Sequence, residues 1–152
     1  MTIYFYKEHG PLGYLASYSN HGFYIDGIFY KTVEHYYQSQ KFLDLEIRTK
    51  IINASTPKEA SNIGRDKTLP LRQDWEKLKN AFMYVGVYEK FKQNKDIQKL
   101  LLETNDSDIV EETTKENYWG CGPLKDGKNI FGQILCKVRN ELKLEKNKEQ
   151  GL

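Results

Sequence analysis

The sequence predicts an α+β fold, a mostly helical single domain with a small sheet that includes an N-terminal β-hairpin. Apolar residues at helical spacing, such as Trp75, Leu78 and Phe82, dominate the middle and end of the chain. Short runs of aromatic and β-branched residues lie near the start. The length of 152 residues fits one domain, and neither a repeat nor a linker divides it. The domain is therefore expected to span residues 1–152, with a charged flexible tail over about residues 146–152.

The expected strands lie in the first part of the chain. Ile3–Tyr6 is a short strand-like run that ends before a Gly-Pro pair. Phe23–Ile25 and Ile28–Tyr30 flank Asp26-Gly27, a dipeptide that favours the tight turn of a hairpin. This hairpin is expected to lead directly into a helix that Thr32 caps.

Helices are expected over most of the remaining chain. They cover the segment from Val33 to about Leu45, Glu46–Asn53, a segment from Pro57 that stops at Gly64-Arg65-Asp66, one from about Asp74 through Phe91, one from Asp96 to Leu102, and a last one from Ile130 to about Leu144. Ile109-Val110 is a further strand candidate. Residues 117–129 contain four glycine or proline residues, which exclude regular structure there.

Composition excludes several classes of function. Lys+Arg 23 and Asp+Glu 21 give a net charge of +2, which is too balanced for non-specific nucleic-acid binding. Cys121 and Cys136 lack the spacing of a disulfide framework or a zinc site, so neither of these is expected. No metal and no other cofactor is predicted for the site. There is no signal peptide and no apolar run of about 18 residues, so the protein is expected in the cytoplasm and away from membranes.

The segment Thr32–Phe42 carries the strongest functional pattern. At 3.6 residues per turn, Glu34, Gln38 and Lys41 form one polar line along the expected helix. Tyr37 and other aromatic residues flank this line, and polar groups within an aromatic wall indicate the lining of a pocket. The alternative is an exposed polar face, in which a Glu–Lys pair contributes a few tenths of a kcal/mol. The segment alone leaves both interpretations open.

The segment Val33–Phe42 resembles the signature of the YbiA-like family, also called the NADAR family. Further motifs of that family follow in the same order and at similar spacing, and together they cover nearly the entire chain. They are Tyr18-Ser19-Asn20, Gly64-Arg65-Asp66, Leu71-Arg72 followed by Trp75, Lys90-Phe91, Tyr118-Trp119-Gly120, and Gly127-Lys128-Asn129 followed by Gly132. The ordered set, more than any single motif, carries the resemblance.

The resemblance implies an α+β, mostly helical N-glycosidase that acts on N-ribosyl compounds. Two substrate classes are attributed to the family, the amino-ribosyl pyrimidine phosphates of early riboflavin synthesis and ADP-ribose attached to guanine in nucleic acid. The resemblance also implies functional roles for Glu34, Trp75 and the acidic residue before the Tyr-Trp pair, which is Glu116 here. The bacterial riboflavin-type member has Asp at that last position, and it also has Asp where this chain has Cys121. No chemistry is assigned to Cys121.

The residues allow a specific mechanism. Cleaving a bond between ribose C1 and an amine develops positive charge on the sugar, which a nearby carboxylate stabilises. Glu34 at a helix N-terminus, where the dipole favours negative charge, suits proton transfer or electrostatic stabilisation. Lys41 is expected to attack an opened imine as a covalent nucleophile, or else to bind phosphate or order Glu34. On one continuous helix the two residues would be separated by about 10 Å along the axis, which is a weakness of the covalent version.

Other side chains are expected to bind the substrate. Trp75, Tyr118 and Trp119 would stack on the base or close over the ribose, although Trp75 equally suits a core anchor. Arg65 and Arg72 are phosphate candidates by their fork geometry, with surface ion pairs as the alternative. The remaining predicted contacts are Ser19, Asn20, Tyr37, Gln38, Gly120 and Asn129, while His35 is expected to be structural.

Three classes of function are compatible with the sequence. An enzyme would act on ADP-ribose or a ribosyl-phosphate small molecule, or on ADP-ribosylated guanine in DNA or RNA. A non-catalytic module would bind ADP-ribose or a nucleotide in the same pocket. A structural or partner-binding helical domain is the third class, and no exposed apolar stripe in the sequence favours it. The substrate class and the oligomeric state stay open.

Overall fold

The computed structural model describes residues 1–151, which form two compact units. The first unit joins Met1–Ala16 to the chain from Asn94 onward, and the second unit is Ser17–Gln93. Each unit combines helices with one two-stranded sheet, so the predicted α+β, mostly helical fold is confirmed. The single domain expected over residues 1–152 stays a prediction, and residue 152 of its expected tail lies outside the described residues.

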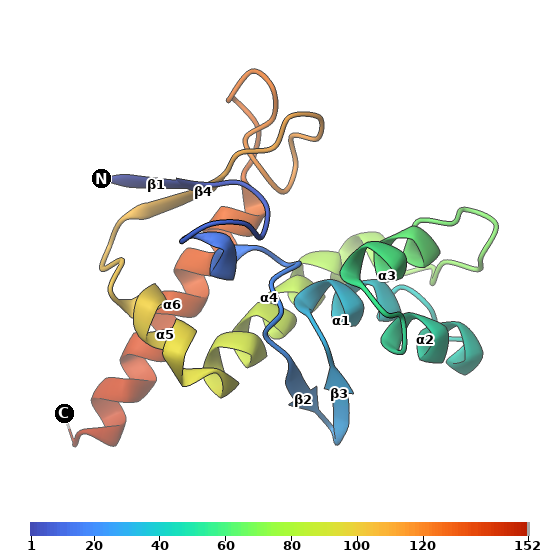
Figure 1. Cartoon of the computed structure of the whole chain (residues 1–152), viewed down its shortest axis with the longest axis horizontal. Helices are drawn as coiled ribbons and strands as arrows, with labels where there is room; N and C mark the ends of the chain where they lie inside the picture. The colour runs from blue at the N-terminus through green and yellow to red at the C-terminus, as the bar shows by residue number, and fades with distance from the viewer. Residues whose placement is uncertain (152) are drawn as a thin grey trace. The chain divides into compact units, whose positions relative to one another are not determined.

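The first unit is built on a parallel pair of strands. β1 (Thr2–Phe5) pairs with β4 (Asp108–Glu111), with Thr2 opposite Asp108 and Phe5 opposite Glu111. The helices of this unit are the short 3₁₀ helix η1 (Gly13–Leu15), α5 (Lys95–Leu102) and α6 (Ile130–Glu149). The first turns of α6 lie next to the strand pair in Figure 1, and the centroid of the Phe131 ring is 6.2 Å from that of the Phe5 ring. The core of this unit therefore lies between α6 and the sheet.

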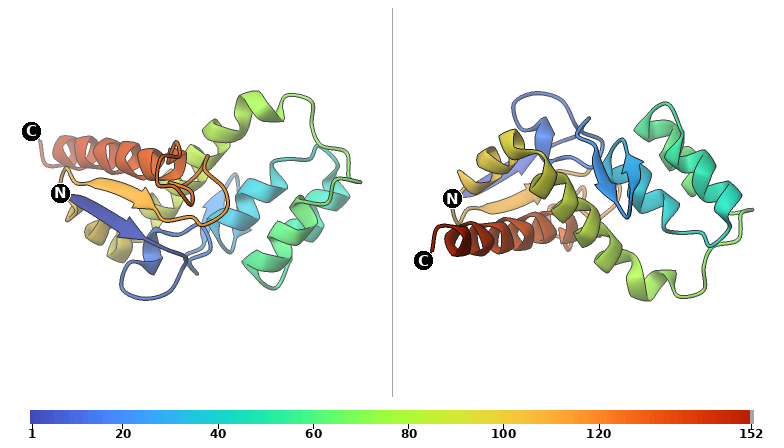
Figure 2. Two further views of the ribbon diagram at one scale, coloured as in Figure 1. Left: turned by 90° about the horizontal axis from the view of Figure 1, so that it is seen from above. Right: turned by 90° about the horizontal axis from the view of Figure 1, so that it is seen from below.

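The start of α6 is fastened to β4. Asn129 adopts a left-handed φ of 52°, and its Nδ2 donates to the carbonyl oxygen of Ile109 (2.8 Å) while its Oδ1 accepts from the N–H of Glu111 (3.0 Å). A Cβ on Gly132 would overlap the Ile109 carbonyl oxygen, so the helix approaches the strand this closely only with glycine there. Figure 2 shows α6 running beside β4 from this point.

The second unit is organised around α1 (Val33–Ser39), whose residues are all buried. β2 (Phe23–Ile25) and β3 (Ile28–Tyr30) form the predicted hairpin before it. Asp26 (φ 50°) and Gly27 (φ 80°) both lie in the left-handed region that a type I′ turn requires, which confirms the sequence-based expectation. The helices that pack against α1 are α2 (Leu45–Ile52), α3 (Pro57–Gly64) and α4 (Trp75–Gln93).

α1 ends earlier than predicted. It stops at Ser39 rather than near Leu45, and Asp44 caps α2 as a separate helix. The N–H of Arg72 donates to the carbonyl oxygen of Lys41 (2.9 Å), so the chain that leads into α4 binds a backbone group just after the last turn of α1. This contact joins residues far apart in the sequence, and no local pattern predicts it.

α6 ends later than predicted, at Glu149 rather than near Leu144. Neither glycine nor proline interrupts the chain between these two residues, so the helix has no reason to stop there. Although α6 is long, no helix within residues 1–151 is apolar enough over a sufficient length to cross a bilayer.

Lys90 is a base buried within the second unit. Its side chain on α4 is 1% exposed, and Nζ lies 5.0 Å from the centroid of the Phe91 ring. Burial lowers the pKa of Lys90 from 10.5 to about 7, because the charged form loses its hydration. The Lys90-Phe91 motif therefore contributes to the packing of α4.

The buried amine predicts a specific dependence of stability on pH. The pKa of Lys90 is about 7 in the folded protein against 10.5 for an ordinary lysine, so between these values the unfolded state binds the extra proton. The group destabilises the fold most below pH 7, and its effect is relieved as the pH rises. From this group alone, the free energy of unfolding is expected to increase by about 2 kcal/mol between pH 7 and pH 9. Lys90→Met should abolish this increase, as measured by urea denaturation at both pH values.

Lys77→Met is the matched control, because Lys77 is exposed on the same helix. This variant should retain the increase seen in the wild type. The same increase in Lys90→Met would mean that another group titrates.

Candidate functional site

Glu34 lies buried in the first turn of α1. Its side chain is only 5% exposed. The hydroxyl of Ser17 donates to Oε1 (3.3 Å), and the side-chain amide of Gln38 donates to Oε2 (2.7 Å). The backbone N–H of Glu34 also donates to the carbonyl oxygen of Ser17 (3.2 Å). The alternative of an exposed polar face is therefore wrong for Glu34 and Gln38, whose polar groups have partners inside the protein.

Ser17 is the contact that sequence reasoning missed. Asn20, a predicted substrate contact in the same loop, is exposed, and Ser19 is buried with its hydroxyl 3.1 Å from Nδ1 of His21. Every residue from 17 to 20 carries a hydrogen-bonding side chain, so the sequence predicts a polar loop without indicating which side chain faces α1. The substrate contacts of Ser19 and Asn20 stay predictions.

α3 approaches α1 at Gly64. A Cβ at this position would overlap the Gln38 carboxamide, so glycine allows Gln38 to keep its place beside Glu34. Within the described residues, Oε1 of Gln38 and Oγ of Ser61 are buried without a hydrogen-bond partner. Two polar atoms near the contact of α1 with α3 thus keep unused hydrogen-bonding capacity.

The amine of Lys41 lies among aromatic rings just after α1. Nζ is 5.8 Å from the ring centroid of Tyr37 and 6.0 Å from that of Trp75, and it donates to the carbonyl oxygen of Gly64 (3.3 Å). Burial lowers the pKa of Lys41, while the negative charge of Glu34 acts in the opposite direction. The carboxylate and the amine that the sequence placed on one polar line therefore interact electrostatically.

Trp75 is both a core residue and a neighbour of Lys41. The ring is buried, stacks on Phe82 at a centroid distance of 5.9 Å, and meets the buried ring of Tyr37 edge-on at 5.1 Å. The core-anchor alternative therefore describes Trp75 in this structure, and the same ring lies within cation–π range of the Lys41 amine. Its stacking on a substrate base stays a prediction, as does the substrate contact of Tyr37.

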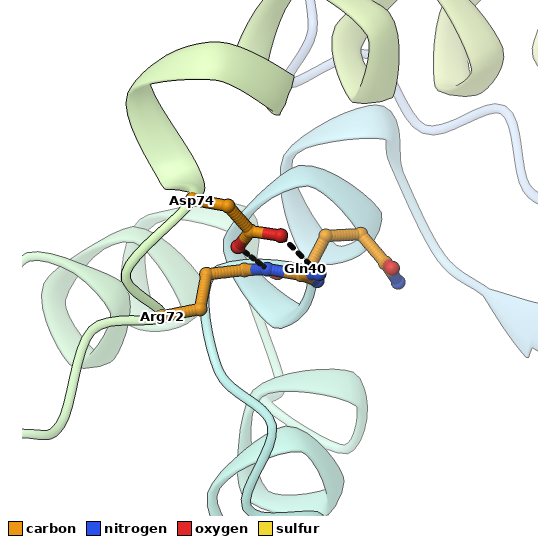
Figure 3. Close-up of polar contacts among 3 residues, drawn as sticks. All are labelled: Gln40, Arg72 and Asp74. Carbon is orange, nitrogen blue, oxygen red and sulfur yellow. Dashed lines mark hydrogen bonds and ion pairs between the residues drawn. The ribbon is translucent and has the colours of Figure 1, made fainter.

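The guanidinium of Arg72 is bound within the protein, as Figure 3 shows. Nε and Nη2 donate to the two carboxylate oxygens of Asp74 at 2.6 and 3.3 Å, and Nη1 donates to the carbonyl oxygen of Gln40 at 3.2 Å. The ion-pair alternative therefore describes Arg72 in this structure, and its phosphate contact stays a prediction. Arg65 is exposed directly after α3, and its charge adds to the lowering of the Lys41 pKa. Of the two arginines, Arg65 is the better placed to meet an anion near Lys41.

His35 has the structural role expected of it. Its Nδ1 lies 2.8 Å from Oγ1 of Thr32, and its Nε2 lies 3.0 Å from the carbonyl oxygen of Ala54. Burial lowers the pKa of His35, so the neutral ring is favoured. The ring therefore links the cap of α1 to the chain between α2 and α3.

The remaining predicted residues lie in the first unit. The Glu116 carboxylate accepts from the backbone N–H groups of Tyr118, Trp119 and Gly120 at 3.0, 2.6 and 3.1 Å. The rings of Tyr118 and Trp119 stand perpendicular with centroids 5.0 Å apart. The structure thus brings these four residues together in one loop. Asn129 uses its amide on β4, so its contact with a sugar hydroxyl stays a prediction.

Metal-binding side chains do not cluster in this protein as far as residue 151. In the part of the chain that the structure describes, no three His, Cys, Asp or Glu side chains are grouped closely enough to hold a metal ion. Cys121 is buried and Cys136 half-buried, and neither is in a disulfide.

Comparison with known proteins gives consistent similarities. A model of the NADAR domain matches residues 4–143. An N-glycosidase of Nostoc punctiforme is 43% identical over 146 residues, which covers 94% of each chain. The N-glycosidase YbiA of Escherichia coli is 38% identical over 144 residues, 95% of this chain and 90% of that one. The solved NMR structure of Escherichia coli YbiA superposes with a TM-score of 0.89 at 37% identity, and the match covers 95% of this chain and 86% of that chain. A riboflavin biosynthesis protein of Vibrio vulnificus is 35% identical over 92% of this chain but only 38% of its own length.

The burial of Glu34 predicts that its hydrogen bond from Ser17 stabilises the fold more than an exposed bond of the same kind. Ser17→Ala leaves a buried carboxylate oxygen with one donor fewer, and the free energy of unfolding should fall by about 1–3 kcal/mol. Ser55→Ala is the matched control, because the Ser55 hydroxyl donates to Glu59 at 2.6 Å where water can replace it. This control should lose only about 0.5 kcal/mol. Equal losses in urea denaturation would contradict the argument.

Proposed function

The chain belongs to the NADAR family, and on this premise we propose that it is an N-glycosidase that hydrolyses the bond between C1 of a ribose and an amine nitrogen. Two relatives that match over nearly their full length bear the name N-glycosidase, which supports the activity. The observation that carries the proposal is the buried carboxylate of Glu34, whose negative charge acts on the pKa of the Lys41 amine. In a site of low polarity, a carboxylate suits the stabilisation of positive charge on the sugar, and an amine suits a covalent attack on C1.

Glu34 would act on the charge and the protons of the reaction. As the C1–N bond breaks, the sugar gains positive charge and the departing nitrogen needs a proton. The carboxylate is held by Ser17 and Gln38, so its direction is set before substrate arrives. Burial lowers the local polarity, and a fixed charge therefore acts on the sugar more strongly than it would in water.

Lys41 would supply the nucleophile in the covalent version of the mechanism. The ribose ring opens when the C1–O4 bond breaks, O4 takes a proton from water, and the lone pair of the substrate nitrogen forms an iminium with C1. Neutral Nζ adds to C1, the substrate nitrogen takes a proton through Glu34, and it departs with the C1–N electron pair. Water then hydrolyses the resulting Lys41 imine, which returns the free amine and an aldehyde that recloses to ribose. The lowered pKa of Lys41 supports this role, because only the neutral amine attacks.

The early end of α1 bears on the distance between Glu34 and Lys41. A separation of about 10 Å applies to two side chains on one continuous helix. α1 ends at Ser39, and Lys41 lies in the turn that follows it. The spacing of one continuous helix therefore does not by itself fix the distance from the amine to Glu34.

Two substrate classes follow from this chemistry. The amino-ribosyl pyrimidine phosphates of riboflavin synthesis are the first candidate, and the name of the Vibrio vulnificus relative supports them. ADP-ribosyl-guanine is the second candidate. Both carry phosphate, and the exposed guanidinium of Arg65 near Lys41 suits an anion of either class. The rival function is a non-catalytic module that binds ADP-ribose or a nucleotide without turnover.

Glu34→Gln separates the enzyme from the binding module. The substitution keeps the shape of the side chain and removes the charge, so kcat should fall at least about 100-fold while ligand affinity changes little. Both substrate classes are assayed side by side, and binding is measured by calorimetry. Glu46→Gln, an exposed carboxylate on α2, is the matched control and should keep wild-type turnover. Unchanged substrate after long incubation with the wild type would favour the binding module.

Borohydride trapping tests the covalent role of Lys41. Reduction during turnover should fix the ribosyl group on Nζ, and peptide mass spectrometry should locate the adduct at this residue. Lys41→Arg should yield no adduct, whereas Lys50→Arg, which changes an exposed lysine of α2, should yield the wild-type amount. Turnover without any adduct in the wild type would exclude the covalent version and leave Lys41 with an electrostatic role.

A further inference from the structure

The backbone of Tyr118–Gly120 is held on both of its sides. The carbonyl oxygens of Tyr118, Trp119 and Gly120 accept from the N–H groups of Ile130 (2.9 Å), Phe131 (2.9 Å) and Asn129 (3.1 Å). These donors belong to the first residues of α6 and its cap, which have no partner within the helix itself. The carbonyl groups of the segment therefore satisfy free N–H groups at the N-terminal end of α6.

The other side of the segment is held by one side chain. Oε1 of Glu116 accepts from the N–H groups of Tyr118 and Trp119, and Oε2 accepts from that of Gly120, all within 3.1 Å. Consecutive backbone amides that converge on one anion form a nest, and bonds to an ionised oxygen are stronger than neutral ones. All six backbone polar groups of the three residues are thus satisfied, three of them by Glu116 alone.

Glu116 is itself fixed at its backbone. The hydroxyl of Thr113 donates to the carbonyl oxygen of Glu116 (2.6 Å) and accepts from the N–H of Gly122 (2.9 Å). A Cβ on Gly120 would overlap the side chain of Thr113, so the segment closes tightly on this threonine. The backbone from which the Glu116 carboxylate extends is therefore held in place, and the carboxylate points toward its own loop.

From this geometry we propose that Glu116 is a positioning residue, which sets the orientation of the Tyr118 and Trp119 rings, and that it does not exchange protons with the substrate. A general acid must come within about 3 Å of the atom that it protonates. Both oxygens of Glu116 are instead directed at amides of its own chain. The structural part of this assignment stands on the loop alone, and the part that concerns turnover rests on the proposed N-glycosidase activity.

The structural part is tested by fluorescence. The chain has two tryptophans, so in a Trp75→Phe background Trp119 is the only emitter. Glu116→Ala should raise the acrylamide quenching constant of Trp119 about two-fold, because three amides lose their acceptor. Glu116→Asp keeps a carboxylate that can still accept from the N–H groups of Tyr118 and Trp119. Its quenching constant should therefore stay within about 1.3-fold of that of the parent. Asp126→Ala, an exposed carboxylate of the same loop, is the matched control and should leave quenching unchanged.

The catalytic part is tested by kinetics with Trp75 intact. Glu116→Gln keeps one oxygen acceptor and loses the titratable proton. If Glu116 only positions the rings, KM should rise about 3- to 10-fold, kcat should fall less than about 5-fold, and the pH profile of kcat/KM should keep both limbs. Glu116→Asp should restore KM to within about 2-fold of the wild type.

The outcomes separate the two proposals. Loss of about 100-fold or more in kcat with Glu116→Gln, with one pH limb missing and Trp119 quenching unchanged, would assign Glu116 to the chemistry and overturn the positioning role. Unchanged quenching in a folded Glu116→Ala would overturn the structural part. If the wild type turns over neither substrate, the N-glycosidase proposal fails, yet the quenching series still decides whether Glu116 holds the loop. If Glu116→Ala does not fold, Glu116→Gln takes its place in the quenching series. Its quenching constant for Trp119 should then lie between that of the folded parent and that of the parent unfolded in urea.

Discussion

A buried carboxylate at the start of α1 constrains the whole second unit. Removing a carboxylate from water is favourable only if donors replace the lost hydration, and Ser17 and Gln38 are those donors for Glu34. Ser17 must therefore lie against the first turn of α1, which fixes the loop before the hairpin. Gln38 keeps its position only because α3 presents Gly64 to it. α1, α3 and the loop that contains Ser17 are thus arranged around the single charged group of Glu34.

The first unit treats its carboxylate in a different way. Glu116 lies in an exposed loop and is satisfied by backbone amides, whereas Glu34 is buried and satisfied by side chains. Backbone donors cannot be exchanged by substitution, so they suit a carboxylate whose task is to shape a loop. Side-chain donors leave the oxygen of Glu34 within reach of other partners when a ligand enters. The environments of the two acidic residues therefore favour different roles, although both were expected to act on the substrate.

Local chemistry made much of the fold predictable. The Asp26-Gly27 turn and the Thr56-Pro57 helix start depend on neighbouring residues alone, and the structure has both where the sequence placed them. The early end of α1 was not predictable, because it coincides with a contact from Arg72 that is distant in sequence. The same reason hid Ser17, one of four consecutive polar residues. The contact of the Asn129 amide with β4 was not predictable either, because a polar residue in a glycine-rich loop has the same appearance whether it meets a ligand or a strand.

Burial acts on both Glu34 and Lys41, and it sets how the two groups influence each other. Burial lowers the pKa of Lys41 and so increases the share of neutral amine, while the charge of Glu34 prevents that lowering from going further. Tyr37 and Trp75 maintain the burial, and their faces also attract the amine whenever it is protonated. A lowered pKa makes the neutral amine easier to reach, as the proposed covalent mechanism requires of Lys41. In the proposed mechanism the aromatic wall around the polar line therefore has a chemical role, because it maintains the burial that lowers the pKa of Lys41.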